Sequence, residues 1–181
     1  MGDALLLVDV LQAFDHEDGP RLLASFQARA RGLVEAVASA RATDLPIIYA
    51  NDDGGRWDGD GSGVIERALA GPAGDTIARI RPKPGDYRIL KPRYSAFVGT
   101  PLQLLLGELE TSRILLCGTA TEMCVAQTAI SARELGFKVT VLAAACACVD
   151  EGDERLVLDY LERIVGCRIA ASAVVGEEAA T

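Results

Sequence analysis

Short apolar runs rich in Val, Ile and Leu alternate along this 181-residue chain with longer segments of helical periodicity. This alternation is typical of a mostly parallel sheet whose two faces are covered by helices. Right-handed helical crossovers then join the strands. The sequence therefore predicts a single α/β domain over residues 1–181, a three-layer α/β/α Rossmann-like sandwich with a six-stranded, mostly parallel sheet.

The elements follow from the apolar runs and from the turn residues between them. Strands are expected over residues 4–9, 46–51, 87–91, 113–117, 138–143 and 167–171, and helices over residues 20–41, 100–109, 121–135 and 151–163. Residues 52–86 are rich in Gly, Asp and Pro and contain one expected helix, over 63–69 or extended to 79. This excursion is predicted to be a lid or specificity loop, with a solvated connector as the alternative.

Charge and cysteine content restrict the partners and the compartment. Eighteen Lys and Arg against 26 Asp and Glu give a net charge of −8, so neither a nucleic acid nor an anionic membrane is an expected partner. The start MGDALLLVDV lacks the cationic segment of a signal peptide. The five cysteines lie mostly in apolar runs, which is typical of reduced, buried thiols. A cytoplasmic protein is expected.

Three residues able to do chemistry stand at predicted strand ends, where open parallel sheets bind ligands. Asp9 closes the first strand, Lys91 closes the third, and Cys124 follows the fourth. Singly, each has an ordinary explanation: a capping carboxylate, a solvated lysine or an inert core thiol. Capping of the next helix by Thr121 would place Cys124 in its first turn, where the helix dipole stabilises a thiolate. Together they predict an activated cysteine nucleophile.

Other nucleophile and metal arrangements have less support. The single histidine, His16, lies in the loop FDHEDGP, so a cysteine–histidine pair is not expected. Cys146 and Cys148 form a Cys-x-Cys pair, which leaves a thiol-redox protein as an alternative. Two cysteines without nearby partners make a weak zinc site. No metal or other cofactor is expected.

Three blocks of sequence carry a family resemblance: ALLLVDVLQAF, LKPRYSAFVGTPLQLLL and LLCGTATEMCVAQTAISARELGFKVTVLAAACA. They resemble the isochorismatase-like cysteine hydrolases, the superfamily that includes nicotinamidase and N-carbamoylsarcosine amidohydrolase. The resemblance implies a catalytic triad of Asp9, Lys91 and Cys124 and a cis peptide between Thr119 and Ala120. It further implies an oxyanion hole formed by the amides of Ala120 and Cys124, a small-molecule substrate, and a homodimer or homotetramer.

Departures from the family pattern narrow the expected function. Nicotinamidases bind a metal through one Asp and several His, but here Asp52 is followed by Gly54 and Gly55 where histidine is expected. The cysteine favours hydrolysis of an amide or ureide over hydrolysis of the vinyl ether of isochorismate. The first block lacks the family's Asp-x-Gln-Asn-Asp-Phe pattern, so other residues must replace those polar groups. A binding protein without catalysis is the remaining alternative.

The candidate substrate-binding residues border the triad in the sequence. They are Phe14, Asn51, Trp57, Arg93, Tyr94 and Phe97. An aromatic wall with a positive group would suit a small planar acid amide, and Arg93 is the candidate anchor for its carboxylate. A role for Arg93 in a subunit interface is the alternative.

Overall fold

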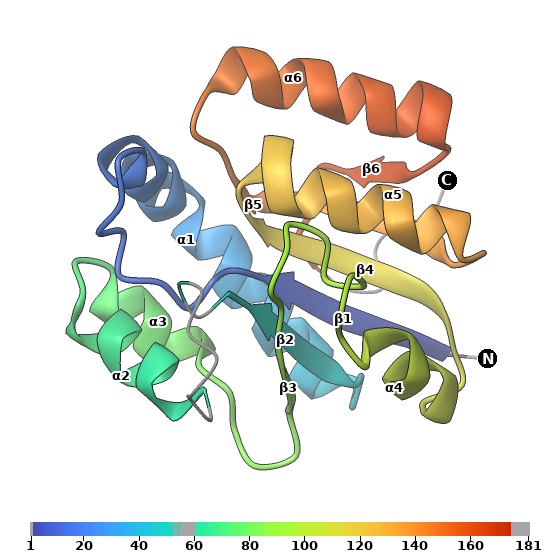
Figure 1. The fold of residues 1–181 in the computed structure, drawn as a ribbon, viewed down its shortest axis with the longest axis horizontal. Coiled ribbons are helices and arrows are strands. Elements are labelled where there is room, and N and C mark those ends of the chain that lie inside the picture. Colours follow the sequence, from blue (N-terminus) through green and yellow to red (C-terminus); the bar gives the residue numbers. More distant parts are fainter. Residues whose placement is uncertain (1, 53, 55–60, 175–181) are drawn as a thin grey trace.

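The computed structural model describes residues 2–52, 54 and 61–174 (Figure 1). In this part of the chain one six-stranded sheet has the order β3-β2-β1-β4-β5-β6, and every pair of neighbouring strands is parallel. The strands are β1 (Gly2–Val8), β2 (Ile47–Asn51), β3 (Tyr87–Leu90), β4 (Thr111–Thr119), β5 (Lys138–Ala147) and β6 (Arg168–Ala170). The predicted six-stranded parallel sheet is confirmed.

Helices cover both faces of the sheet (Figure 1). They are α1 (Gly19–Ala42), α2 (Ser62–Ala70), α3 (Gly74–Ile80), α4 (Leu102–Glu108), α5 (Ala126–Glu134) and α6 (Glu151–Tyr160), with π-helical turns η1 (Thr121–Val125) and η2 (Leu161–Val165). Helix α1 packs against β2, β4, β5 and α3 on one face, while α4 and α5 pack against β4 and β5 on the other. The three-layer sandwich is therefore confirmed.

The centre of the sheet is completely buried. Residues 4–8 of β1 are completely buried, which explains why this run carries no polar residue before its end. Beside it, Gly118 of β4 has a φ of 135°, and a Cβ there would lie only 2.0 Å from the carbonyl oxygen of Val8. Glycine is therefore required where β4 passes β1, directly before the segment that bears Cys124.

Two expected helices differ in extent from the structure. The expected helix over 63–69 corresponds to α2, but its extension to residue 79 is wrong. Gly71 is extended (ψ 177°) and precedes Pro72, which disfavours helical backbone in the preceding residue, so α3 forms as a separate helix. The expected helix over 151–163 is instead divided into α6 and the π-helical turn η2, which ends at Gly166 in the left-handed region (φ 76°). Neither difference moves the strand ends that bear Asp9 and Lys91.

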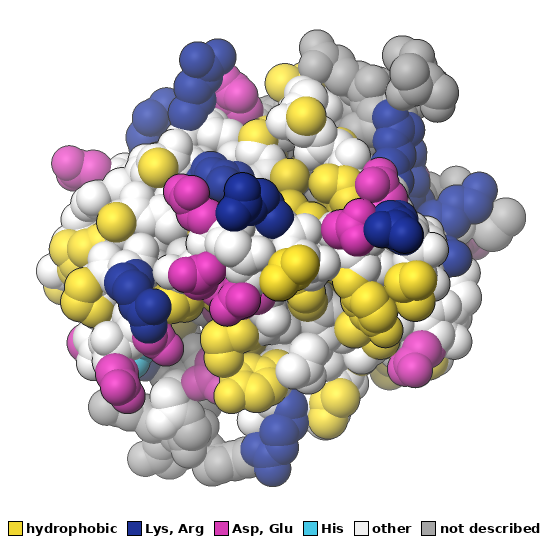
Figure 2. Space-filling view, turned by 90° about the horizontal axis from the view of Figure 1, so that it is seen from above, with side chains coloured by type: hydrophobic (Ala, Val, Ile, Leu, Met, Phe, Trp, Pro, Cys, Tyr) yellow, Lys and Arg dark blue, Asp and Glu magenta, His cyan; other side chains and the backbone are white. Residues whose placement is uncertain are grey.

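The surface seen in Figure 2 has mixed character. Lys and Arg side chains on this face are interspersed with acidic and hydrophobic ones and do not form one continuous patch. No helix in the described ranges is both long enough and apolar enough to span a bilayer.

Candidate active site

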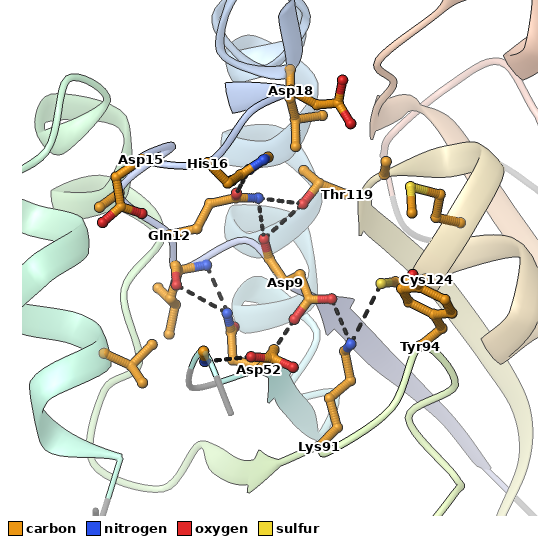
Figure 3. Close-up of a pocket in the computed structure, with 18 of the residues that line it drawn as sticks. Asp9, Gln12, Asp15, His16, Asp18, Asp52, Lys91, Tyr94, Thr119 and Cys124 are labelled. Carbon is orange, nitrogen blue, oxygen red and sulfur yellow. Dashed lines mark hydrogen bonds and ion pairs between the residues drawn. The ribbon is translucent and has the colours of Figure 1, made fainter. Parts of the chain in front are cut away.

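Asp9, Lys91 and Cys124 meet at the carboxyl edge of the sheet. The amide of Asp9 donates to the carbonyl of Ala50 (2.9 Å) and that of Lys91 to the carbonyl of Asn51 (2.9 Å), so both residues continue the strand ladder by one position. β2 lies between β1 and β3, so Asp9 and Lys91 do not follow adjacent strands. The long lysine side chain instead reaches past β2 to the aspartate (Figure 3).

Asp9 lies just beyond β1 rather than inside it, with a φ of 49° that aspartate tolerates better than most residues. Its side chain is mostly buried. One carboxylate oxygen lies 2.6 Å from Lys91 Nζ, and the other accepts a hydrogen bond from the amide of Asp52 (2.7 Å). Burial raises the pKa of Asp9, although the charge of Lys91 opposes the shift. A carboxylate with a raised pKa is a better proton acceptor.

Lys91 is buried, with 3% of its surface exposed, so the ordinary explanation of a solvated lysine does not hold. Its ammonium group contacts Asp9, lies 3.5 Å from Cys124 Sγ and donates to the carbonyl oxygen of Arg93 (3.0 Å). Burial alone would lower the pKa of Lys91, but the interactions with Asp9 and Cys124 outweigh it and raise the pKa. The lysine therefore remains a fixed positive charge between carboxylate and sulfur (Figure 3).

Cys124 lies in the π-helical turn η1 and is only half buried. Burial, followed by the negative charge of Asp9, raises the pKa of the Cys124 thiol to about 12. The expected stabilisation of a thiolate is therefore wrong for the free protein. Capping by Thr121 is also wrong, because no cap hydrogen bond forms and its hydroxyl lies 2.9 Å from Glu154 Oε1. In the free protein Cys124 is therefore a thiol next to the Asp9 carboxylate.

This arrangement predicts an unusual pH dependence for alkylation of Cys124 by iodoacetamide. With a pKa of about 12, the rate is expected to rise about tenfold per pH unit from pH 7 to 10. Asp9→Asn removes the negative charge and leaves Lys91 unpaired, so it should lower the thiol pKa and speed labelling at pH 8. Lys91→Met should slow it. Mass analysis of the Cys124 peptide gives each rate.

Asp44→Asn is the matched control, since Asp44 is exposed at the opposite, amino edge of the sheet and already adopts a φ of 53° that asparagine accepts. It should leave the rate unchanged. Rapid labelling of the unaltered protein at pH 7, or slower labelling of Asp9→Asn, would contradict this description of the site.

A cavity of about 550 Å³ opens above these residues. Of the expected site residues it is lined by Asp9, Asn51, Lys91, Tyr94, Thr119, Ala120 and Cys124. The other described lining residues are Leu11, Gln12, Ala13, Asp15, His16, Asp18, Leu22, Asp52, Gly54, Val64, Arg67, Met123 and Val149. Val64 and Arg67 belong to α2, so the 52–86 excursion supplies part of the cavity wall.

Three expected substrate-binding residues do not line this cavity. Phe14 is buried against Phe26 with ring centroids 5.1 Å apart, and Phe97 stacks on Phe137 at 6.0 Å. Arg93 is exposed, and its guanidinium donates to the carbonyl oxygen of the preceding residue. Phe14 and Phe97 were wrongly expected in the wall because their rings pack against other aromatic rings of the core, whereas Tyr94 does line it. Trp57 lies outside the described residues.

Gln12 joins the β1 and β4 ends of the site. Its amide nitrogen donates to the carbonyl of Asp9 (2.9 Å) and to Thr119 Oγ1 (2.6 Å), and the Thr119 hydroxyl donates to the same carbonyl (2.7 Å). His16 Nε2 lies 3.3 Å from Gln12 Oε1. The peptide bond between Thr119 and Ala120 is cis. Gln12 could have been recognised as a candidate site residue from the sequence, because it is the one polar residue in the apolar stretch VLQAF.

A buried ion pair supports the turn that bears the nucleophile. Glu154 of α6 is 5% exposed, and its carboxylate accepts from Thr121 and lies 3.0 Å from Arg29 Nη2. Arg29 of α1 also donates to the carbonyl of Ala143 (2.7 Å). No local sequence pattern predicted this network, because its members come from α1, β5, η1 and α6.

The remaining alternatives concern metals and redox chemistry. No group of three or more His, Cys, Asp or Glu within the described part of the chain is arranged to hold a metal ion. Cys146 and Cys148 are free and almost completely buried. Burial raises the pKa of Cys146 to about 12, which keeps the thiol protonated and opposes the redox alternative.

The arrangement brings together a sulfur nucleophile, a carboxylate proton acceptor and a fixed ammonium charge, all lining one cavity. This is the combination that acyl transfer through a covalent thioester needs. No histidine takes part in these contacts.

Comparisons with known proteins agree with this fold. An uncharacterised isochorismatase family protein from Bacillus subtilis, YaaI, is 29% identical over 175 residues, covering 97% of each chain. Streptothricin hydrolase from Streptomyces noursei is 30% identical over 97% of this chain, which spans 60% of that protein's length. The structure of a pyrazinamidase/nicotinamidase from Streptococcus mutans superposes with a TM-score of 0.75 at 26% identity, covering 93% of this chain and all of that one.

N-carbamoylsarcosine amidase from Thermoplasma acidophilum superposes with a TM-score of 0.73 at 26% identity, covering 96% of this chain and 97% of that one. The family model described as an isochorismatase domain matches residues 3–172. That match takes in β1 from Asp3 onward, the five other strands and the three residues that meet at the cavity. The chain therefore belongs to the isochorismatase family of hydrolases.

Proposed function

We propose that this protein hydrolyses the C–N bond of a small, non-peptide amide or ureide through a thioester on Cys124. The observation that carries the proposal is the position of Lys91 Nζ, 2.6 Å from the Asp9 carboxylate and 3.5 Å from Cys124 Sγ. The relatives named ureidoacrylate amidohydrolase and streptothricin hydrolase, and the solved N-carbamoylsarcosine amidase, support hydrolysis at such groups.

In the first step the Cys124 thiol gives its proton to Asp9 while the sulfur attacks the carbonyl carbon. The amides of Ala120 and Cys124 stabilise the oxyanion. The C–N bond then breaks, and Asp9 returns the proton to the leaving nitrogen, which departs as ammonia or an amine. A raised pKa for Asp9 suits both transfers, since the group must accept and then donate.

In the second step water hydrolyses the thioester. Asp9 takes one proton from the water as its oxygen attacks the thioester carbonyl. The C–S bond breaks, the acid product leaves, and the sulfur recovers the proton from Asp9. Lys91 keeps its charge throughout and offsets the negative charge that moves between carboxylate and sulfur.

The experiment is a screen of small amides and ureides for release of ammonia, followed by rapid acid quenching and mass analysis of the Cys124 peptide. A substrate should add the mass of its acyl group to that peptide, and Cys124→Ala protein should show neither adduct nor ammonia. Ammonia release at an undiminished rate by Cys124→Ala would overturn the proposal. Release of pyruvate from isochorismate without an adduct would favour vinyl-ether hydrolysis.

A further inference from the structure

The loops around the cavity carry an excess of negative charge. The segment from Asp9 to Pro20 contains four acidic residues and no Lys or Arg. Among the described lining residues there are four carboxylates, Asp9, Asp15, Asp18 and Asp52, against two cations, Lys91 and Arg67. A cleft lined mainly by one sign of charge concentrates ligands of the opposite sign.

Part of this charge is already compensated within the protein. Asp9 is paired with Lys91 at 2.6 Å, and Asp18 is paired with Arg21 at 2.5 Å. Asp15 and Asp52 take part in none of the ion pairs between described residues. Both residues are exposed. Asp52 Oδ1 also accepts a hydrogen bond from the amide of Gly54. Among the lining carboxylates, these two are therefore the ones whose charge is not paired with a described cation.

The wall next to the nucleophile is aromatic. Tyr94 is 52% exposed, lines the cavity and lies beside Cys124 in Figure 3. An exposed ring together with carboxylates is a common way for proteins to hold an ammonium or guanidinium group. The expected anchor for an anionic substrate, Arg93, does not line the cavity, and the ammonium of Lys91 is already held by Asp9.

We propose that the substrate is a small amide bearing a positive charge, with its cationic group facing Asp15 and Asp52 and its carbonyl at Cys124. The identity of the reacting group rests on the proposed hydrolase function. The charge preference of the cavity does not rest on it, and so the two are tested separately.

The first test uses Cys124 as a reporter and requires no catalysis. Two methanethiosulfonates of similar size are compared, one ending in trimethylammonium and one in sulfonate. Each forms a mixed disulfide with the cysteine and releases methanesulfinate. The labelling rate for each reagent is followed by mass on the Cys124 peptide. The ratio of the cationic to the anionic rate is then divided by the same ratio measured with 2-mercaptoethanol.

We expect the cationic reagent to be favoured on the order of tenfold at low ionic strength, and less at 0.5 M salt. The double variant Asp15→Asn/Asp52→Asn should lose at least about two-thirds of this preference. Asp44→Asn, with its charge change at the far edge of the sheet, should keep it. A normalised ratio of one or below, or an unchanged ratio in the double variant, would overturn the inference.

The second test separates this inference from the proposed function. Three amides of matched length are compared by ammonia release: 3-aminopropanamide, which is cationic, neutral butanamide, and anionic succinamate. The highest kcat/KM is expected for the cation, and the double variant should reduce that advantage. Equal hydrolysis of all three would overturn the charge preference and leave the hydrolase proposal standing. Preferential labelling of Cys124 by the cationic reagent, with no amidase activity in the wider screen, would support the charge preference and overturn the hydrolase proposal.

Discussion

Hydrolysis is expected to disappear when Cys124 is replaced by alanine, with a loss on the order of 10⁴-fold or more in kcat/KM. In the proposed mechanism the sulfur forms the covalent bond to the substrate, and alanine has no group that could replace it. Asp9→Asn should cause a comparable loss, because the amide cannot take the thiol proton although it keeps the shape of the carboxylate. Ammonia release from the best substrate of the screen gives both values.

The Asp9 variant separates chemistry from simple thiol reactivity. Its Cys124 should be alkylated faster than in the unaltered protein, yet it should not turn over substrate. Cys167→Ala is the matched control, since Cys167 is a buried thiol just before β6, outside the cavity lining. It should retain activity. Unfolding curves verify that each variant is folded, and substantial turnover by either Cys124→Ala or Asp9→Asn would reject the mechanism.

The second large effect is expected on stability, at the Arg29–Glu154 pair. Arg29→Met leaves the Glu154 carboxylate buried without its cation, which should lower the free energy of unfolding by about 3–5 kcal/mol. Glu154→Gln should cost less, about 1–2 kcal/mol, since the Arg29 side chain is 30% exposed and its charge can turn toward water. Urea unfolding at pH 7 measures both changes.

An exposed pair on the same helix provides the control. Arg31 and Glu35 are 2.7 Å apart, with side chains 89% and 40% exposed, so Arg31→Met should change stability by no more than about 1 kcal/mol. The double variant Arg29→Met/Glu154→Gln should be more stable than Arg29→Met alone, because the uncompensated carboxylate is gone. A loss for Arg29→Met no larger than for Arg31→Met would show that the buried pair does not secure the Cys124 turn.

The strands and the residues at their ends could be predicted from the amino-acid sequence. Buried parallel strands are continuous apolar runs, so residues 4–8 and 114–116 could be recognised without knowledge of their neighbours. The polar residue that follows such a run lies at the carboxyl edge of the sheet, which is how Asp9 was identified. β3 is mostly exposed, so Lys91 was identified only by its place at the end of a predicted strand. Asn51 and Tyr94, which line the cavity, were predicted only because each lies close in the sequence to a predicted strand end.

The interactions between those residues could not be predicted in this way, because they depend on how distant segments pack. β2 separates β1 from β3, so the contact between Lys91 and Asp9 depends on strand order and on side-chain reach. The raised pKa of Cys124 depends on burial and on the charge of Asp9, both supplied by distant segments. Phe14 and Phe97 went into the core because aromatic partners from other elements were available to them. Periodicity reports local conformation, whereas burial and electrostatic pairing arise between segments far apart in the chain.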